Sequence, residues 1–261
     1  VETKRAEIRH AAERMPIEQL RELVAAAPTP REFAAAVWGR AEDGVRAIAE
    51  MKRNSPSAGL LRDPYDPAEL ARGYHRHGAA ALSVLTDANY FGGELSHLAL
   101  ARGACPLPVL RKEFIIDAYQ VYEARAGGAD AVLLIAEVLD GGQIAEWVEL
   151  ARSLGMAALV EVHDESNLTT VLDRLGPPDR DRYLLGINNR DLRLQRTDLA
   201  TSERLSRLLP KGCPFVSESG IRTPADVERV RHAGACAILV GESLLKAGSP
   251  GEKLAELLKR G

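Results

Sequence analysis

The chain has 261 residues, of which 46% are hydrophobic and 27% are charged, as expected for a soluble globular protein. Its 34 basic and 37 acidic residues give a net charge of −3 and are well mixed, which argues against electrostatic binding of nucleic acid or membranes. The three cysteines are widely spaced, which argues against a disulfide framework. No apolar run approaches the roughly 18 residues of a membrane-spanning helix, and the charged N-terminal segment lacks the features of a signal peptide. We therefore expect a cytoplasmic protein.

Residues 1–45 carry helical patterns that Pro16 and the segment 27–32 divide into two or three pieces. We expect an N-terminal helical extension that covers one end of the molecule. A helix that closes the bottom of a barrel, or that serves a dimer contact, explains the same pattern equally well. Together with residues 46–261, the extension is expected to form a single domain, 1–261.

Short apolar runs alternate with helical patterns from about residue 46 to the end of the chain. The runs occupy residues 46–52, 80–86, 107–114, 130–136, 157–162, 183–188, 213–219 and 236–243. Each run and the helical pattern after it have the length of one βα unit. Eight such units predict a closed (β/α)8 barrel, or TIM barrel, because open parallel sheets usually have fewer strands.

The helical patterns between the runs begin with good capping residues. Asp66, Asp117, Asp140 and Asp164 each precede one pattern, and Thr223 precedes another with a proline after it. Short polar side chains at this position accept hydrogen bonds from free backbone N–H groups, and proline fits the first helical turn. The sequence therefore places helix starts at these five positions.

Charged residues inside the apolar runs are the most informative feature. Because side chains alternate along a strand, Glu50 and Lys52 share a face with Ile48. By the same rule Lys112, Glu161 and Glu218 share the faces of Leu110, Leu159 and Val216. All five charges lie near the ends of their strands, so in a barrel they meet at one mouth, where active sites of this fold lie. A structural network of salt bridges is the alternative, but lone buried charges are costly and five at one rim favour a wet, functional site.

Three polar residues near strand ends are weaker candidates. Asn188 ends the sixth strand and continues the charged ring, although it also suits a turn. Arg190 fits a surface ion pair with Asp191 or another neighbour better than it fits catalysis. His163 lies two residues after Glu161 but beside the start of a helix, which favours a surface role.

Two loops near the C-terminus predict a phosphate site. Ser219 and Gly220 follow the seventh strand, and Gly241 and Glu242 follow the eighth. These loops hold phosphate in many barrels of this type, because glycine lets backbone N–H groups approach the oxygens. Tight turns alone explain the glycines less well. The polar loop 52–59 after the first strand is expected to act as a lid, in which Lys52 can meet an anion and Ser55 or Ser57 can hydrogen-bond to it.

The histidines and cysteines form no metal-binding spacing, and neither a dinucleotide nor a P-loop motif is present. We therefore expect no metal and no cofactor.

These segments resemble the indole-3-glycerol phosphate synthase family of tryptophan biosynthesis. The resemblance rests on IAEMKRNSPSAG, LSVLTDANYFGG, VLRKEFIID, ADAVLLIAEVL, LVEVHDE, LLGINNRDL, VSESGI and AILVGESLL, in that order along nearly the whole chain. It implies a lyase that closes the ring of 1-(2-carboxyphenylamino)-1-deoxyribulose 5-phosphate with loss of carbon dioxide and water, giving indole-3-glycerol phosphate. It also implies an N-terminal extension that helps to close over the phosphate.

The resemblance assigns roles by position. Lys112 is implied as the general acid on the substrate carbonyl, Glu161 and Glu50 as the acid–base pair of the dehydration, and Lys52 as a cation near the substrate anion. The remaining implied site residues are Asn188 and Glu218 for orientation, Ser219, Gly220, Gly241 and Glu242 for phosphate, Phe91, Phe114 and Leu133 for the aromatic ring, and Ser55 and Arg190 for further substrate contacts. A desolvated lysine with a lowered pKa and a glutamate with a raised pKa would suit this chemistry.

Two alternatives remain. An aldose–ketose isomerase on the same phosphate-binding barrel would use a cysteine or aspartate at other strand ends, yet Cys213 and Cys236 precede their strands. A barrel that binds the phosphate metabolite without catalysis would lack the charged ring. The expected partner is a small sugar phosphate, and the chain is expected to be a monomer or a homodimer.

Overall fold

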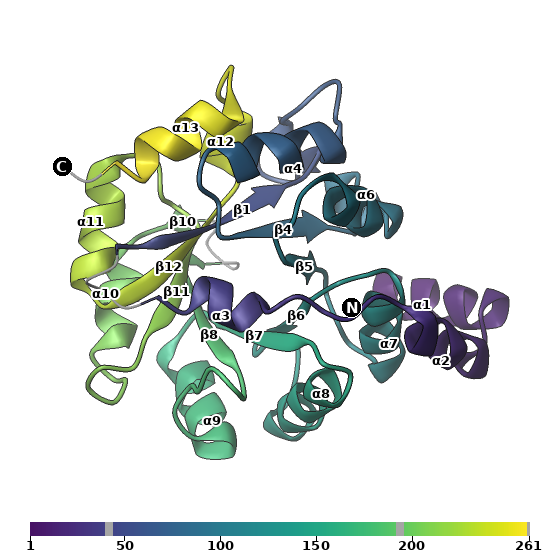
Figure 1. Cartoon of the computed structure of the whole chain (residues 1–261). Helices are drawn as coiled ribbons and strands as arrows, with labels where there is room; N and C mark the ends of the chain where they lie inside the picture. Colours follow the sequence, from purple (N-terminus) through teal and green to yellow (C-terminus); the bar gives the residue numbers. More distant parts are fainter. Residues whose placement is uncertain (40–43, 192–195, 260–261) are drawn as a thin grey trace.

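Eight parallel strands close into a barrel in a computed structural model of the protein, which describes residues 1–39, 44–191 and 196–259 (Figure 1). Around the ring the strands are β1 (Arg46–Met51), β4 (Ala81–Leu85), β5 (Val109–Lys112), β6 (Ala131–Ile135), β7 (Ala157–Val162), β8 (Leu184–Asn188), β11 (Phe215–Glu218) and β12 (Ala235–Val240), which pairs with β1. The predicted TIM barrel is confirmed. Residues 40–43 of the expected extension and 260–261 of the expected barrel lie outside the described residues.

Helices connect the strands and surround the barrel (Figure 1). They are α4 (Pro67–Arg76), α5 (Ala88–Phe91), α6 (Ser96–Ala104), α7 (Ala118–Ala126), α8 (Gly141–Ser153), α9 (Glu165–Leu175), α10 (Ala200–Ser206), α11 (Pro224–His232), α12 (Glu242–Leu245) and α13 (Pro250–Leu257). All five predicted capping side chains accept hydrogen bonds from the first turns of α4, α7, α8, α9 and α11. The predicted helix starts are therefore confirmed.

The alternation of side chains along the strands separates two layers of core. Ala47, Ala49 and Met51 belong to the layer between strands and helices. Ile48 and Leu110 belong to the barrel interior, where Leu159 and Val216 join them. The inward faces predicted for β1, β5, β7 and β11 are therefore confirmed, and each of these faces ends in a charged residue at the barrel mouth.

The N-terminal extension forms three helices, α1 (Glu2–Arg14), α2 (Ile17–Ala26) and α3 (Phe33–Val37). Helix α3 lies across the amino end of the barrel, and its Phe33 and Val37 are buried in the interior core (Figure 1). The segment before α3 is fixed by Arg31, whose guanidinium donates hydrogen bonds to the carbonyl oxygens of Arg102, Cys105 and Leu107. This part of the extension therefore closes the bottom of the barrel.

Helix α1 contacts the opposite end of the barrel. The buried Lys4 ammonium lies 2.8 Å from an Asp87 carboxylate oxygen and 3.0 Å from Glu113, which follow β4 and β5. Glu7 accepts a further hydrogen bond from Asn89. These contacts lie at β4 and β5 and not at the loops after β11 and β12, where the extension was expected to cover the phosphate; β5 stands opposite β11 in the ring.

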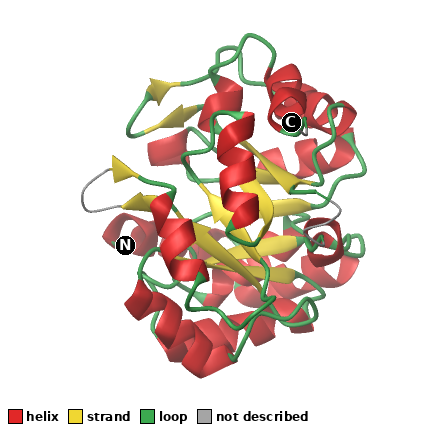
Figure 2. Cartoon of the chain, turned by 90° about the vertical axis from the view of Figure 1, so that its left-hand side faces the viewer, coloured by secondary structure: helices red, strands yellow, loops and turns green. Residues whose placement is uncertain are grey.

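Two small hairpins project from the mouth of the barrel (Figure 2). The first joins β2 (Asn54–Ser55) and β3 (Gly59–Leu60) within the loop after β1, and the second joins β9 (Arg190–Asp191) and β10 (Arg196–Thr197) after β8. Loops at the carboxyl ends of barrel strands are where this fold places function. Among the described residues, no helix is long and apolar enough to cross a membrane.

Candidate active site

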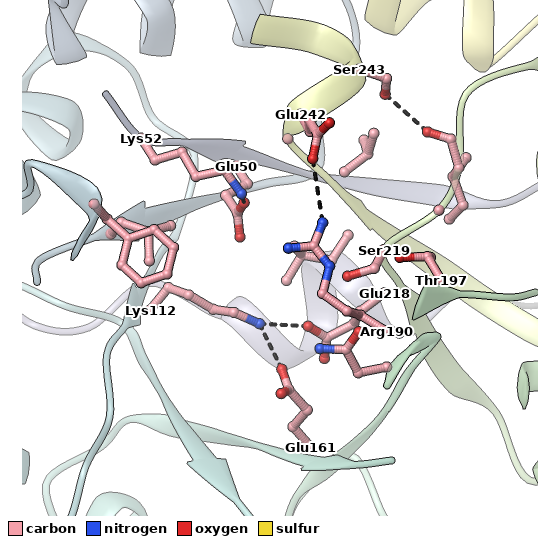
Figure 3. Close-up of a pocket in the computed structure, with 18 of the residues that line it drawn as sticks. Glu50, Lys52, Lys112, Glu161, Arg190, Thr197, Glu218, Ser219, Glu242 and Ser243 are labelled. Carbon is pink, nitrogen blue, oxygen red and sulfur yellow. Dashed lines mark hydrogen bonds and ion pairs between the residues drawn. The ribbon is translucent and has the colours of Figure 1, made fainter. Parts of the chain in front are cut away.

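A cavity of about 560 Å³ opens at the carboxyl ends of the barrel strands (Figure 3). A volume of this size suits a small metabolite. The walls combine a charged floor with apolar side chains and two glycine-containing loops. They are formed by Glu50, Lys52, Leu85, Asp87, Phe91, Lys112, Glu113, Phe114, Leu133, Ile135, Glu161, Asn188, Arg190, Thr197, Glu218, Ser219, Gly220, Ile221, Arg222, Leu239, Val240, Gly241, Glu242, Ser243, Lys246 and Lys253.

Lys112 joins two carboxylates from different strands at the floor of this cavity (Figure 3). Its Nζ donates to Glu161 Oε2 at 2.7 Å and to Glu218 Oε2 at 2.6 Å. The carboxylates come from β7 and β11, and both residues are at least 97% buried. The other oxygen of Glu218, Oε1, is buried without a hydrogen-bond partner among the described residues. This oxygen lies against the backbone of Gly186 on β8.

The three groups share their protons unequally. Burial raises the pKa of Glu218 to about 8, because the nearby Glu161 charge adds to burial and Lys112 only partly offsets it. Burial also disfavours the Glu161 charge, but Lys112 and then His163 outweigh burial and lower the pKa of Glu161. The two pKa shifts run in opposite directions, so the neutral form is favoured at Glu218 and the charged form at Glu161.

The pKa of Lys112 is raised, which corrects the expectation of a lowered value. Burial favours the neutral amine, but the charges of Glu161, Glu218 and Glu50 outweigh burial. The expected raised glutamate pKa is found at Glu218 and not at Glu161 or Glu50. Period-2 alternation could place these groups on one rim but could not show how many carboxylates would surround one ammonium.

Glu50 and Lys52 form a second ion pair at the end of β1. Lys52 Nζ lies 2.5 Å from Glu50 Oε1, and both residues are buried. Burial raises the pKa of Glu50, but Lys52 and then Lys112 outweigh burial and lower it. Glu50 packs against the backbone of Gly241, where a Cβ would meet Glu50 Oε1 at 2.6 Å. The phosphate loop after β12 therefore fits directly against this pair.

Glycine also makes room for Glu218. A Cβ on Gly186 of β8 would collide with Glu218 Oε1, and it would lie 3.4 Å from Leu159. Gly186 is paired in register with Val216 on β11 and with Glu161 on β7. The absence of a side chain here therefore lets two carboxylates from the flanking strands approach the same lysine.

The loop after β11 makes a tight turn that is joined to the loop after β12. Ser219 and Gly220 adopt φ angles of 66° and 83°, in the left-handed region. The buried Asn189 side chain stabilises this turn, since its Nδ2 donates to the carbonyl oxygens of Glu218 at 2.9 Å and Ser219 at 3.1 Å. The Ser243 hydroxyl joins the two loops by donating to the Ile221 carbonyl oxygen at 2.9 Å.

The matching family model is that of indole-3-glycerol phosphate synthase, and it matches residues 1–257. The chain belongs to the indole-3-glycerol phosphate synthase family. It is 48% identical over 258 residues to the indole-3-glycerol phosphate synthase of Albidiferax ferrireducens and 47% identical to that of Polaromonas naphthalenivorans. Each match covers 98% of this chain and 96% of the relative. The resemblance found in the sequence is therefore confirmed.

Solved structures support the barrel alone. A crystal structure of 3-hexulose-6-phosphate synthase is similar with a TM-score of 0.60 and 18% identity, covering 82% of this chain and 98% of that chain. A structure of the tryptophan synthase complex from Pyrococcus furiosus is similar with a TM-score of 0.56 and 16% identity, covering 82% of this chain and 97% of that one.

Nearly all of the site residues suggested by the family resemblance line the cavity. The charged and polar ones, Glu50, Lys52, Lys112, Glu161, Asn188 and Glu218, meet at the floor, and Phe91, Phe114 and Leu133 form apolar wall. Ser219, Gly220, Gly241 and Glu242 line the cavity at the loops after β11 and β12. Ser55 is the exception, because it is buried in the hairpin after β1 and its hydroxyl accepts a hydrogen bond from Ala58 N.

Arg190 is closer to the site than its surface interpretation implied. Its guanidinium lies 3.3 Å from Glu242 Oε2 and 3.4 Å from Ser57 Oγ, and it lines the cavity (Figure 3). The side chain therefore connects the β2–β3 hairpin with the loop after β12.

Several lining residues escaped the sequence analysis. Arg222, Lys246 and Lys253 place positive charge near the phosphate loops. Asp87 and Glu113 line the rim where Lys4 compensates their charge. The position of Arg222, shortly after the glycine of the loop that follows β11, could have identified it from the sequence. The contacts of Asp87 and Glu113 with Lys4 could not, because they depend on a helix that is distant in sequence.

The expected surface role of His163 is wrong. The residue is 8% exposed, and its ring lies between Glu161 and Glu137. The start of α9 beside it is a poor guide, because His163 ends the inward-facing alternation of β7 before the chain turns outward. Across the described ranges, no group of three or more histidine, cysteine, aspartate or glutamate side chains is arranged to hold a metal ion.

Proposed function

We propose that this cavity is where the chain carries out the indole-3-glycerol phosphate synthase reaction, the ring closure of 1-(2-carboxyphenylamino)-1-deoxyribulose 5-phosphate. The observation that carries the proposal is the Lys112 ammonium held at 2.7 and 2.6 Å by Glu161 and Glu218 on the floor of a cavity with phosphate loops at one side. The substrate carries an aromatic carboxylate at one end and a phosphate at the other, which matches this distribution of groups.

Lys112 acts first, as the general acid of ring closure. Its raised pKa means that it meets the substrate fully protonated. It releases a proton only when a strongly basic oxygen forms beside it, as the substrate carbonyl oxygen becomes when the aromatic carbon attacks. The two carboxylates hold the ammonium in place, so the acid is positioned before the reaction starts.

Glu161 and Glu50 serve the later proton transfers. Both are carboxylates at neutral pH, because neighbouring lysines lower the pKa of each. One takes the proton that leaves carbon, and the other, once protonated, helps the hydroxyl group to leave as water. Glu218 lines the cavity with a raised pKa, which favours its neutral carboxylic acid, and its proposed part is to orient the substrate.

The two ends of the substrate are held by different chemistry. Backbone N–H groups of the loops at Ser219, Gly220 and Gly241 bind the phosphate, and basic side chains nearby strengthen the attraction. Phe91, Phe114 and Leu133 contact the aromatic ring at the other end. Holding both ends brings the aromatic carbon to the carbonyl, which is the main requirement of a cyclisation.

The test is to incubate the purified protein with this substrate and follow indole fluorescence and carbon dioxide release. Equal amounts of both products are expected. An aldose–ketose isomerase would release no carbon dioxide, and a non-catalytic binding protein would shift its thermal midpoint with the substrate but give no fluorescence.

The location, oligomeric state, binding partners and domain organisation of the enzyme are also proposals. We propose a cytoplasmic monomer or homodimer that acts on this small sugar phosphate and binds neither nucleic acid nor membranes. Residues 1–45 and 46–261 are proposed to form one domain, since α3 is buried in the interior of the barrel.

A further inference from the structure

A histidine links the catalytic Glu161 to a carboxylate outside the cavity. His163 Nε2 lies 3.4 Å from Glu161 Oε1, and His163 Nδ1 lies 3.3 Å from Glu137 Oε2. Glu137 stands in the turn after β6, which is tied to β7 by the hydrogen bond from Ala136 N to the Glu161 carbonyl oxygen at 2.9 Å. The three side chains thus form a row on a rigid part of the barrel rim.

Exposure increases along this row. The side chains of Glu161 and His163 are each 4% exposed, whereas that of Glu137 is 23% exposed. Glu161 lines the cavity, but His163 and Glu137 are not among the described residues that do so. A substrate in the cavity would therefore cover Glu161 and leave Glu137 in contact with water.

The ring is not held as a structural histidine would be. Within the described ranges, neither ring nitrogen of His163 has a hydrogen-bond partner in good geometry, although each has a carboxylate oxygen within 3.4 Å. Buried polar atoms usually have a partner, and an exception calls for a functional explanation. A small reorientation of the ring would bring each nitrogen into hydrogen-bonding geometry with the carboxylate oxygen beside it, and a proton could then pass from one side to the other.

The proposed reaction needs such a route. The substrate enters with an aromatic carboxylate and loses it as neutral carbon dioxide, so one proton must be taken up in every turnover. The carbonyl oxygen takes up one proton during ring closure, and the hydroxyl group it becomes takes up a second when it leaves as water. Only one proton is released in return, from carbon, during the dehydration. The missing proton must come from water while the substrate covers the floor of the cavity.

We propose that His163 and Glu137 form a relay that supplies this proton to Glu161, an inference that rests on the proposed function. Glu137 takes a proton from a hydronium ion or a buffer acid in the solvent and gives it to His163 Nδ1, while the proton on Nε2 moves to the Glu161 carboxylate. Glu161 is then a carboxylic acid, Glu137 is again a carboxylate, and the neutral ring carries its proton on Nδ1. After product release, Nδ1 returns its proton through Glu137 to the solvent, and Nε2 regains one from the solvent that refills the cavity, which restores the starting tautomer.

The charges around the ring fit this direction of transfer. The charged groups that face His163 are Glu161 on its own strand and Glu137 on the turn after β6, with Lys112 beyond Glu161. The His163 ring in turn helps to lower the pKa of Glu161. His163 acts through Glu161 and is not itself placed to touch the substrate.

The test compares His163→Gln, Glu137→Gln and the double variant with the wild type in single-turnover reactions followed by indole fluorescence. His232 and Glu228 form a matched control pair, because they lie 4.0 Å apart on the exposed face of α11. The variants His232→Gln and Glu228→Gln should react like the wild type. Thermal midpoints of all variants are measured alongside, and each reaction is repeated with increasing imidazole at fixed pH and ionic strength.

The relay predicts a rate about ten- to a hundredfold lower in His163→Gln, below the loss for a direct general acid, with KM unchanged. Added imidazole should restore much of the rate, because it carries protons to Glu161. Glu137→Gln should react more slowly than the wild type, and the double variant should be no slower than His163→Gln, since both residues serve one path. A normal rate in His163→Gln would overturn the relay. So would a reduced rate that imidazole does not restore, together with a lowered thermal midpoint. An inactive wild type would instead refute the proposed function.

Discussion

Replacing Lys112 with methionine separates the chemical role of the ammonium from its structural role. Methionine keeps most of the side-chain volume but leaves Glu161 and Glu218 buried without their shared cation. Breaking a buried ion pair in this way costs about 3–5 kcal/mol of unfolding free energy. Turnover should fall by at least about a hundredfold, the usual scale for loss of a general acid.

The cost should depend on pH in a defined direction. Without the cation, burial raises the pKa of Glu161 above its unfolded value, so its stabilising contribution is lost as the pH rises. In the wild type Lys112 lowers that pKa, so no such loss occurs at Glu161 above about pH 5. The deficit of Lys112→Met relative to the wild type should therefore be larger at pH 8 than at pH 6, by up to about 1.4 kcal/mol per pH unit.

Urea unfolding at the two pH values measures this deficit, with Lys211→Met at an exposed position as control. Adding Glu161→Gln should recover much of the stability, because the unpaired charge is removed, without recovering turnover. Near-normal turnover of Lys112→Met would refute its role as the acid. A deficit independent of pH would refute the charge arrangement described for the floor of the cavity.

Further predictions concern the neighbouring groups. Gly186→Ala should lower turnover and reduce the free energy of unfolding in urea by about 1–3 kcal/mol, because its Cβ collides with Glu218. The control Gly73→Ala has open space around the new Cβ and should not destabilise the protein. Equal effects of the two substitutions would contradict the packing described for Gly186. The pKa of Glu218 is raised to about 8, so the free energy of unfolding of the wild type should fall relative to that of Glu218→Gln as the pH rises from 5 to 8. If the unfolding free energies of the two proteins changed in parallel with pH, this prediction would be wrong. Inorganic phosphate should raise the KM for substrate in steady-state assays, and should do so more weakly in Gly220→Ala, whose φ of 83° disfavours a side chain; an unchanged KM would move the phosphate site elsewhere.

The fold was largely predictable because its signals are local and repeated. Apolar runs with period-2 alternation define inward and outward faces, and capping residues such as Asp66 and Thr223 mark helix starts. Parallel strands that close into a ring bring all their carboxyl ends together. The gathering of Glu50, Lys112 and Glu161 at one mouth follows from this alone.

The contacts within the site were less predictable, because they depend on distances across the barrel. No local pattern shows that Lys112 pairs with two carboxylates, that Lys4 approaches the rim from a separate helix, or that Ser55 turns into its own hairpin. The ionisation of the site follows from these contacts. The sequence therefore predicts which residues meet, whereas the ionisation of each depends on distances across the barrel that only the coordinates give.

The central claim is that charged ends of separate strands form one site around one substrate. The most direct test is a crystal structure with bound indole-3-glycerol phosphate. The phosphate should contact the backbone at Gly220 and Gly241, and the indole ring should lie against Phe114 with Lys112 and Glu161 within hydrogen-bond reach of the ligand or of a bridging water. A product bound outside the barrel mouth, or with its ring far from Lys112, would contradict the account.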